Sequence, residues 1–355
     1  MRVALDATPL TLATGGTARY VRELSLALAL EFSADDFLLL SDQPFEPPSA
    51  CPTNLRSGRH PRRWIEKRWW LYGVSREASR SHADVFHGTH FVAPWLPLRP
   101  TVVTLHDLSP WLNPAWRKDA GFVRRRAPIL LGLGLATMVI TPSRAVRRGV
   151  ISRFGLHPDR VHAVPLAACA HFRPAPPAAP AAPYFLYLGT LEARKNIEML
   201  IRAWREVRRR LPVDLLLAGR VRRDFSPPAE EPGLRLLGEV PDQDLPSLYT
   251  AAAAVLYPSL YEGFGLPVLE AMQCGALVFA SRDPAIMEVA GDGAVLLDAG
   301  DTSGWAAAMH AAVAHPGDFA SYRHRALERA KLFSWTETAR LTRAVYVEAL
   351  ARFGS

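Results

Sequence analysis

Short apolar runs alternate with longer segments of mixed polarity along most of the chain. Residues 253–257 and 276–280 are apolar throughout, and residues 2–7 are apolar apart from Arg2 and Asp6. Continuous apolar runs of this kind are typical of strands that are buried on both faces of a parallel sheet. Segments such as residues 18–31 and 197–210 instead carry their apolar residues with the period of a helix. The pattern therefore predicts an α/β fold.

The same pattern places the other expected elements. Further strands are expected at residues 36–41, 83–87, 101–108, 137–141, 184–188, 213–218, 234–237 and 295–297. Further helices are expected at residues 142–153, 266–274, 302–315 and 318–332, and from residue 335 onward. Residues 43–59 are rich in proline and serine, so we expect a loop there.

A proline- and alanine-rich segment divides this pattern into two halves. Its composition is typical of a stiff, extended linker. A chain of 355 residues is also longer than a single core usually grows. We therefore expect a first doubly wound domain at residues 1–172, a linker at 173–183, a second doubly wound domain at 184–334 and a final helix at 335–355.

Composition narrows the class of protein. Cys51, Cys169 and Cys274 show neither an even count nor metal-cluster spacing, which favours a reducing compartment, and we expect a cytoplasmic protein. The sequence also lacks a signal-peptide pattern and an apolar stretch long enough to span a bilayer. The net charge is +8, and only four of the 42 basic residues are lysine. Arginine suits phosphate, although a GC-rich genome gives the same bias, and we expect no nucleic-acid partner.

The most informative stretch is a glycine-rich loop between two expected strands. Gly263 and Gly265 lack side chains, so a ligand can approach the loop backbone closely. Leu266 begins the expected helix, whose unpaired N–H groups and positive dipole end suit an anion such as a pyrophosphate. Pro267 fits the first turn of that helix, and Gly275 fits its C-terminal stop.

Two carboxylates accompany this loop. Glu262 lies in the loop and Glu270 about two helical turns further on, so we expect both to face one cleft. There they can accept hydrogen bonds from the vicinal hydroxyls of a sugar or a ribose. The alternative is an ordinary turn between strand and helix whose glutamates are solvated surface charges.

A pair of cations follows the first strand of the second half. Arg194 and Lys195 lie between this strand and the next expected helix. Two cations at such a turn are what a leaving pyrophosphate requires if no metal neutralises it.

The first half of the chain has two comparable features. Gly15 and Gly16 connect the first strand to the first helix. His106 and Asp107 end a β-branched strand, at the edge where open α/β sheets bind ligands. The alternatives are an ordinary turn for the glycines and a satisfied structural histidine for His106.

These motifs carry a resemblance to a known family. Its residues are Pro258-Ser259, Glu262-Gly263-Phe264-Gly265, Pro267, Glu270-Ala271 and Gly275. Together they resemble the donor-binding signature of retaining, nucleotide-sugar-dependent glycosyltransferases of family 4, which have the GT-B fold. The resemblance extends from Gly15-Gly16 to Trp335. It implies two Rossmann-like domains facing a cleft, with the acceptor on the N-terminal domain and the final helix crossing back to that domain.

The resemblance also implies roles for single residues. As catalytic residues it implies His106, Glu262, Arg194 and Lys195. As donor-binding residues it implies Gly15, Gly16, Asp107, Thr190, Gly263, Phe264, Gly265, Leu266 and Glu270. Where the family often has Gly-Arg, this chain has Gly189-Thr190, so the role of that arginine passes to Arg194.

The expected function is transfer of a sugar from a nucleotide diphosphate sugar to a glycan or lipid-linked acceptor. The expected enzyme is a retaining hexosyltransferase that needs neither a metal nor another cofactor. GDP-mannose is the first expectation for the donor, because the chain most resembles the mannosyltransferase-like branch, and UDP- and dTDP-sugars stay open. A nucleotide-sugar epimerase or phosphorylase of the same fold and a non-catalytic nucleotide-sugar-binding protein are the alternatives.

One segment combines basic and aromatic residues. It runs from Arg62 to Tyr72 and has the composition of an interfacial helix that binds anionic headgroups. We therefore weigh a peripheral contact with the inner face of the membrane. The alternative is a domain helix whose tryptophans are buried in the core.

Asp242-Gln243-Asp244 matches the DxD pattern of metal-dependent glycosyltransferases of another fold. It directly precedes an expected helix, where an aspartate is a normal N-cap. We therefore interpret these residues as a helix cap and predict no metal site.

Overall fold

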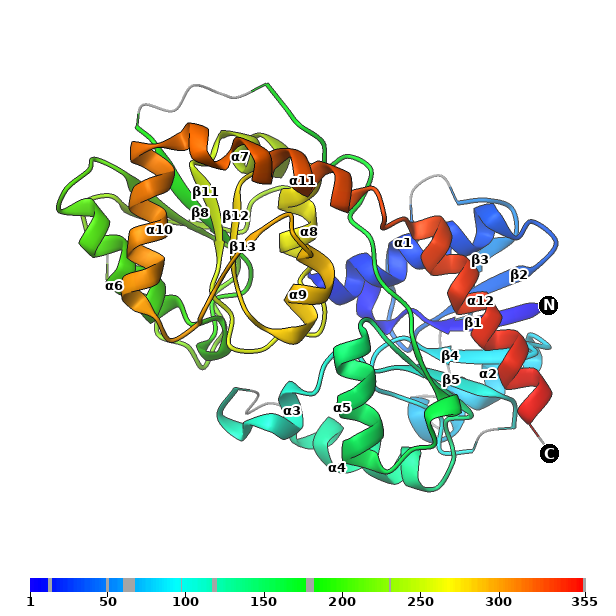
Figure 1. Ribbon diagram of the computed structural model, residues 1–355. Helices are drawn as coiled ribbons and strands as arrows, with labels where there is room; N and C mark the ends of the chain where they lie inside the picture. Colours follow the sequence, from blue (N-terminus) through cyan, green and yellow to red (C-terminus); the bar gives the residue numbers. More distant parts are fainter. Residues whose placement is uncertain are drawn as a thin grey trace. The chain divides into compact units, whose positions relative to one another are not determined.

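The computed structural model describes residues 1–11, 15–48, 51–59, 68–96, 98–116, 120–176, 182–229 and 231–353 (Figure 1). The chain forms two units. Unit 1 comprises Met1–Leu112, Asp119–Leu166 and Ser334–Ser355, and unit 2 comprises Asn113–Lys118 and Ala167–Phe333. The expected final helix thus falls in unit 1, and the expected boundary after residue 172 falls within unit 2. Residues 177–181 of the expected linker lie outside the described residues.

Unit 1 is built on a seven-stranded sheet with the order β3-β2-β1-β4-β5-β6-β7. Its strands are β1 (Arg2–Asp6), β2 (Asp36–Leu40), β3 (Leu55–Ser57), β4 (Val85–Gly88), β5 (Thr101–Thr104), β6 (Met138–Thr141) and β7 (Val161–Ala163). Each neighbouring pair is parallel. The chain starts at β1, proceeds outward to β3 and continues on the other side of β1 with β4. The topological switch point, where such sheets bind ligands, therefore lies between β1 and β4.

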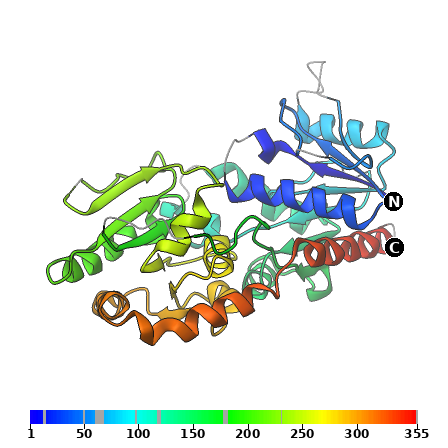
Figure 2. The ribbon, with the colours of Figure 1, turned by 90° about the horizontal axis from the view of Figure 1, so that it is seen from above.

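The helices of unit 1 are α1 (Gly16–Glu31), α2 (Val74–Arg80), α3 (Ser109–Leu112), α4 (Gly121–Gly132), α5 (Arg144–Phe154) and α12 (Trp335–Arg352). Helix α12 lies alongside α1, as Figures 1 and 2 show in red and blue. The Arg340 guanidinium forms an ion pair with Glu31 of α1 at 2.6 Å. The last helix of the chain is therefore part of the first unit.

A buried histidine connects α12 to the sheet of unit 1. Nδ1 of His87 is 2.7 Å from the Tyr346 hydroxyl, and Nε2 is 2.8 Å from the Thr104 hydroxyl. Burial lowers the pKa of His87 to about 3, with a smaller effect from His106. His87 is therefore neutral at physiological pH, and its two hydrogen bonds fix the docking of α12.

Unit 2 is built on a six-stranded sheet with the order β10-β9-β8-β11-β12-β13. Its strands are β8 (Tyr184–Leu188), β9 (Asp214–Ala218), β10 (Leu234–Gly238), β11 (Ala254–Tyr257), β12 (Val278–Ser281) and β13 (Val295–Leu297). All of these pairs are parallel. The order is that of the Rossmann fold, with the switch point between β8 and β11. The expected pair of doubly wound α/β domains is confirmed.

The helices of unit 2 are α6 (Ile197–Arg208), α7 (Leu245–Ala251), α8 (Leu266–Gln273), α9 (Pro284–Ala290), α10 (Thr302–Ala314) and α11 (Ala320–Ala330). Helix α8 follows Gly265, whose φ of 95° favours glycine, and stops before Gly275, whose φ is 70°. The expected start and stop of this helix are confirmed. Helix α9 is capped by Asp283, whose carboxylate accepts from the N–H groups of Ala285 and Ile286.

Three expectations need correction or restriction. Residues 43–59 are not only loop, because they contain the edge strand β3, which is too short to show a strand period. The strand expected at 101–108 ends at Thr104. Of the segment from Arg62 to Tyr72, the part up to Lys67 lies outside the described residues.

The described part of that segment divides into a buried and an exposed half. Trp69 is 4% exposed and packs in a core cluster with Ala4 and Leu40. Leu71 and Tyr72 are 41% and 45% exposed. Among the described residues, we find no helix that is both long enough and apolar enough to traverse a lipid bilayer.

Candidate functional site

Buried charges gather at the switch point of unit 2. The loop after β8 carries Arg194 and Lys195 in a short 3-10 helix (η6, Ala193–Lys195), and the loop after β11 carries Glu262. All three are at least nine-tenths buried. Because β8 and β11 are adjacent parallel strands, their C-terminal loops meet at one edge of the sheet. The sheet topology therefore brings together residues that lie far apart in the sequence.

Glu262 binds both cations. The Lys195 ammonium donates to Oε1 of Glu262 and, at 2.8 Å, to the Tyr257 hydroxyl. Nη1 of Arg194 donates to Oε2 of Glu262 at 3.2 Å and to the carbonyl of Tyr261 at 2.9 Å. Both oxygens of the carboxylate are therefore engaged by charged donors.

The charges at this site determine its protonation. Burial by itself would raise the pKa of Glu262, but the charges of Lys195 and Arg194 outweigh burial and lower that pKa to about 2. Burial lowers the pKa of Lys195, although the Glu262 carboxylate opposes this effect. Glu262 is therefore ionised throughout the physiological range.

Further hydrogen bonds hold the loop after β11 in place. The backbone N–H of Glu262 donates to Asp283 at 3.3 Å, and Leu260 N–H donates to the carbonyl of Arg194 at 2.8 Å. Burial, and then the nearby charge of Glu262, raise the pKa of Asp283. The loops after β8 and β11 are thus joined by a backbone hydrogen bond as well as by ion pairs, and Asp283 holds the second of these loops from the start of α9.

The predicted loop residues have different surroundings. Gly265 is the residue before α8, and Leu266 is its first residue. The Phe264 ring is 5% exposed and packs edge-on against Phe333 at 5.9 Å. The Phe264 side chain is part of the core, so Phe264 can contact a ligand only through its backbone. Gly263 is buried beside them.

Thr190 lies in the first turn after β8, where Gly189 has a φ of 150°. The Tyr187 hydroxyl donates to the carbonyl of Thr190 at 3.1 Å. This bond fixes the backbone of the turn in front of Arg194.

Glu270 does not share the environment of Glu262. It is 1% exposed and accepts a hydrogen bond from the Tyr249 hydroxyl at 3.1 Å. Glu262 is 6% exposed, so both glutamates are buried but have different partners, and the expectation that both face one cleft stays a prediction.

Unit 1 carries the remaining predicted residues. Nε2 of His106 is 2.8 Å from the carbonyl of Thr89, and the Tyr20 ring packs edge-on against the imidazole at 4.8 Å. Burial lowers the pKa of His106, while the Thr89 carbonyl and Asp107 oppose this effect. His106 is therefore neutral near pH 7, with its proton on Nε2, where it donates to Thr89.

Asp107 is a turn residue in this structure. Its Oδ1 accepts from the backbone N–H of Ser109 at 2.8 Å and from the Ser109 hydroxyl at 2.7 Å. Gly15 has a φ of 124° and precedes α1, which begins at Gly16, and both are exposed. These four residues form a second group, in unit 1, at the carboxyl ends of its strands.

Sequence reasoning missed several residues of the charged cluster. The Tyr257 hydroxyl accepts a hydrogen bond from Lys195, and Asp283 accepts one from the backbone N–H of Glu262. Glu192 forms an ion pair with Arg194 at 2.7 Å. The Asp283-Pro284 dipeptide is a helix-start signal, so the cap was predictable. The contact between Tyr257 and Lys195 depends on the sheet order, whereas Glu192 and Arg194 are two residues apart in one loop.

Asp242 and Asp244 are exposed residues before α7. Asp244 occupies the N-cap position, but its side chain accepts no capping hydrogen bond there, so that part of the cap interpretation is wrong. Within the described ranges, no group of three or more His, Cys, Asp or Glu side chains is placed to hold a metal ion.

Comparison with known proteins adds to this geometry. The family model described as "Glycosyltransferase Family 4" matches residues 14–168, and the family model described as "Glycosyl transferases group 1" matches residues 182–315. The chain is 34% identical over 286 residues to O-antigen chain mannosyltransferase B of Escherichia coli, which covers 73% of this chain and 73% of that protein.

Solved structures show the same fold. Sucrose-phosphate synthase from Thermosynechococcus elongatus superposes with a TM-score of 0.77, 21% identity and 99% of both chains covered. HepE from Anabaena, solved in complex with UDP and glucose, gives a TM-score of 0.72, 18% identity and coverage of 98% of this chain and 99% of HepE. The chain belongs to glycosyltransferase family 4 and has the GT-B fold.

Proposed function

We propose that this glycosyltransferase is a metal-independent retaining enzyme that transfers mannose from a nucleotide diphosphate sugar to a glycan or lipid-linked acceptor. The observation that carries the proposal is the buried pair Arg194 and Lys195 beside Glu262 at the switch point of unit 2. This pair supplies two positive charges at the strand ends, where a diphosphate requires them.

The first role is to hold the donor diphosphate. Lys195 and Arg194 would bind phosphate oxygens, and the N-terminus of α8 after Gly265 adds the positive end of the helix dipole. These groups stabilise the negative charge that grows on the leaving diphosphate as the glycosidic C–O bond breaks. One preorganised donor of this kind contributes about 3 kcal/mol to the barrier reduction.

The second role belongs to Glu262. Without a ligand it pairs with both cations. A donor phosphate would compete for these cations and release carboxylate oxygens, which can then accept hydrogen bonds from hydroxyls of the donor sugar. Glu270 is assigned to the ribose hydroxyls, and exposure of its carboxylate then requires a change at the Tyr249 hydroxyl.

The third step is removal of the acceptor proton. Glu270 is buried and bonded to Tyr249, so Glu262 and Glu270 do not form a pair placed to act as nucleophile and acid. This arrangement supports attack on the face from which the diphosphate leaves, with a donor phosphate oxygen taking the acceptor proton. Neutral His106 would contact the sugar or the acceptor side.

Mannose and GDP-mannose are first choices because the 34% identical relative is an O-antigen chain mannosyltransferase. UDP-sugars remain in the test because HepE was solved with UDP and glucose. The test is transfer from a panel of GDP-, UDP- and dTDP-sugars in the presence of EDTA, with the anomeric configuration of the product read by NMR. The proposal expects GDP-mannose to be the best donor and the configuration to be retained. An inverted product would contradict the retaining mechanism.

We also propose that unit 1 touches an anionic membrane surface at a peripheral site. Leu71, Tyr72, Leu96, Leu98, Phe122, Ile129 and Leu133 are between 41% and 67% exposed and form what we term the apolar face. Exposed arginines accompany these residues: Arg68 precedes Leu71, Arg125 lies on α4 with Phe122, and Arg76 lies on α2, which follows Tyr72. Apolar side chains flanked by arginines suit the interface of an anionic bilayer.

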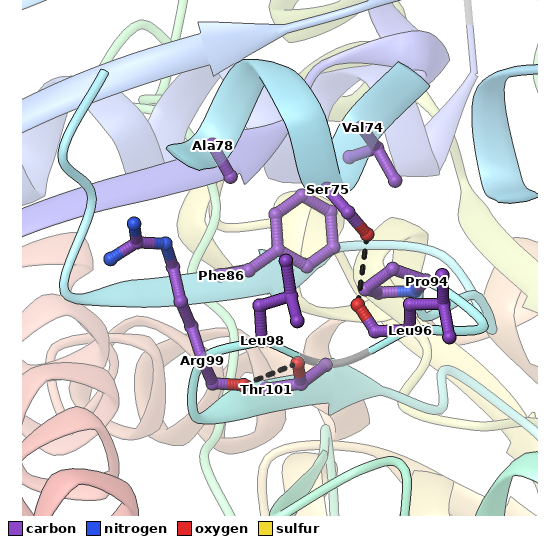
Figure 3. Close-up of a pocket in the computed structure, with 9 residues that line it drawn as sticks. All are labelled: Val74, Ser75, Ala78, Phe86, Pro94, Leu96, Leu98, Arg99 and Thr101. Atoms are coloured by element: carbon purple, nitrogen blue, oxygen red, sulfur yellow. Dashed lines mark hydrogen bonds between the residues drawn. The ribbon is translucent and has the colours of Figure 1, made fainter. Parts of the chain in front are cut away.

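One buried arginine joins the elements of this face. The Arg126 guanidinium lies within 5.1–5.4 Å of the ring centroids of Trp70, Trp95 and Phe122. Figure 3 shows the Phe86 ring between Ala78 and Leu98, with Ser75 donating to the carbonyl of Leu96 at 2.9 Å. The pocket in Figure 3 has a free volume of about 10 Å³, room for about one water, so the face is a surface rather than an acyl-chain site.

Vesicle binding tests this contact. The protein should sediment with vesicles of anionic phospholipid, less so at high salt, and Phe122→Ser with Leu133→Ser should weaken binding. Leu30→Ser is the control, because Leu30 is 71% exposed on α1, outside the apolar face. Binding that ignores salt and these variants would contradict the contact.

A further inference from the structure

A chain of alternating charges extends away from the diphosphate-binding pair. Its members, in order, are Lys195, Glu262, Arg194, Glu192, Arg222 and Asp224. The first three members carry the proposed binding and chemistry. The last three have had no role so far.

Glu192 is a bridge between two arginines. Its Oε1 lies 2.7 Å from Nε of Arg194, and its Oε2 lies 2.9 Å from Nη1 of Arg222. The residue is 4% exposed, so solvent hardly screens these contacts. A carboxylate between two guanidinium groups also offsets the repulsion between them.

Arg222 is itself held from several sides. Its Nη1 donates to the carbonyl of Trp116 at 2.6 Å, and its Nε and Nη2 reach the two oxygens of Asp224 at 2.8 and 3.0 Å. The paired contact with Asp224 fixes the plane of the guanidinium. Arg222 therefore fixes the position of Glu192.

Donor binding affects the two ion pairs of Arg194 differently. Its contact with Glu262 is the one that the proposed donor binding exchanges for phosphate. Its contact with Glu192 is anchored independently by Arg222 and stays in place. The orientation of the Arg194 guanidinium during the reaction then depends on Glu192.

We propose that Glu192, held by Arg222, is the positioning residue that orients Arg194 toward the donor diphosphate. This inference rests on the proposed function, because it assigns the diphosphate to Arg194. It also gives a physical reason why Arg194 can replace the arginine that is missing at Thr190. Glu192 acts through Arg194 and does not itself touch the substrate.

The test is a double-mutant cycle read by calorimetric titration with free GDP and UDP, using whichever binds the wild-type protein. Glu192→Gln should weaken diphosphate binding about tenfold in the wild-type background, because the Arg194 guanidinium loses its ion-pair partner at Nε. In an Arg194→Ala background the same change should have almost no further effect. Arg222→Gln should weaken binding in the same way, and Arg222→Lys should restore part of the loss.

Glu231→Gln is the matched control. Glu231 pairs with Arg205 in the same unit, but this pair is exposed and distant in sequence from the two loops, so diphosphate affinity should not change. Thermal melting of each variant separates loss of binding from loss of folding. If Glu192→Gln does not fold, the same cycle with Arg222→Gln decides the question.

An equal loss in both backgrounds would mean a merely structural role, and no loss in the wild-type background would mean no role; either result overturns the inference. Absence of diphosphate binding by the wild-type protein would overturn it as well. The outcome is separate from that of the proposed function, which fails if diphosphate binds but no sugar is transferred.

Discussion

Lys195 and Glu262, 67 residues apart in sequence, form a buried ion pair at the switch point between β8 and β11. The lysine also donates to Tyr257 at 2.8 Å, and Arg194 binds the other carboxylate oxygen. This relationship keeps two cations charged in a buried position without a ligand. In the proposed function a diphosphate displaces Glu262 from these cations, and the predictions for ligand binding rest on that exchange.

Glu262→Gln should destabilise the protein in a pH-dependent way. The pKa of Glu262 is lowered from 4.5 to about 2, so its ionised form stabilises the folded state at neutral pH. Linkage gives an effect of about 3 kcal/mol above pH 4.5, which is lost as the pH falls from about 4.5 toward 2. Urea unfolding of both proteins at neutral pH and near pH 3 measures the difference. A difference that stays constant with pH would show that the charge of Glu262 does not stabilise the fold.

Asp6→Asn should stabilise the folded protein at neutral pH, an effect opposite in sign to that of Glu262→Gln. Burial raises the pKa of Asp6 from 3.8 to about 6, against hydrogen bonds from Thr8. The ionised side chain therefore destabilises the folded state above pH 6, and this penalty disappears as the pH falls from about 6 toward 3.8. Asparagine keeps an oxygen for the Thr8 N–H, which Oδ1 of Asp6 now accepts at 3.0 Å, without the charge.

The expected gain for Asp6→Asn is up to about 3 kcal/mol at neutral pH, and little below pH 4. Urea unfolding across this range measures it. A variant less stable than wild type at neutral pH would contradict the assigned burial penalty.

The two glutamates should differ in ligand binding. Glu270→Ala should weaken binding of the free nucleoside diphosphate as well as of the nucleotide sugar, because Glu270 is assigned to the ribose. Glu262→Ala should leave binding of the free diphosphate unchanged or stronger, because it removes the carboxylate that competes for Arg194 and Lys195, and it should impair the intact nucleotide sugar. One charge-assisted hydrogen bond corresponds to roughly 10- to 150-fold in affinity, which calorimetric titration resolves. Equal effects of both substitutions on both ligands would mean that the pair is misassigned.

The control for this pair is Tyr249→Phe. It removes the hydroxyl that donates to Glu270 at 3.1 Å and keeps the carboxylate. If Glu270 must leave Tyr249 to reach the ribose, diphosphate binding should be unchanged or stronger in this variant. Weaker binding would contradict this, because it would mean that the hydrogen bond from Tyr249 to Glu270 has a structural role only.

Most elements were predictable because their signals are local. The apolar runs that predicted β8, β11 and β12 are continuous, and Gly265 and Gly275 stand where α8 needs a positive φ. Strand β3 was not predicted because three residues at a sheet edge are too few to show the two-residue period of a strand. The end of β5 was set too late because no glycine or proline lies between Thr104 and Leu108 to mark where the strand stops.

The candidate site was predictable in its residues more than in its contacts. The charges of Arg194, Lys195 and Glu262 were recognisable from the two loops, but their meeting depends on β8 and β11 being neighbours. Glu192 carried no signal, because its partner Arg222 lies after another strand, β9. The hydrogen bond from Tyr249 to Glu270 was not predictable, because helical spacing gives the face on which a residue lies and not its partner across the core.

In the proposed mechanism Lys195 and Arg194, rather than a metal ion, stabilise the leaving diphosphate. The most direct measurement is the rate of mannose transfer from GDP-mannose by wild-type and Lys195→Ala protein in excess EDTA. The account predicts an undiminished wild-type rate and a loss of about 100-fold or more in the variant, the size of one removed charge-stabilising donor. Arg194 still pairs with Glu262 in this variant, so its melting should show a folded protein. Loss of the wild-type rate in EDTA with recovery on adding Mg²⁺ or Mn²⁺, or an unchanged rate for Lys195→Ala, would contradict the claim.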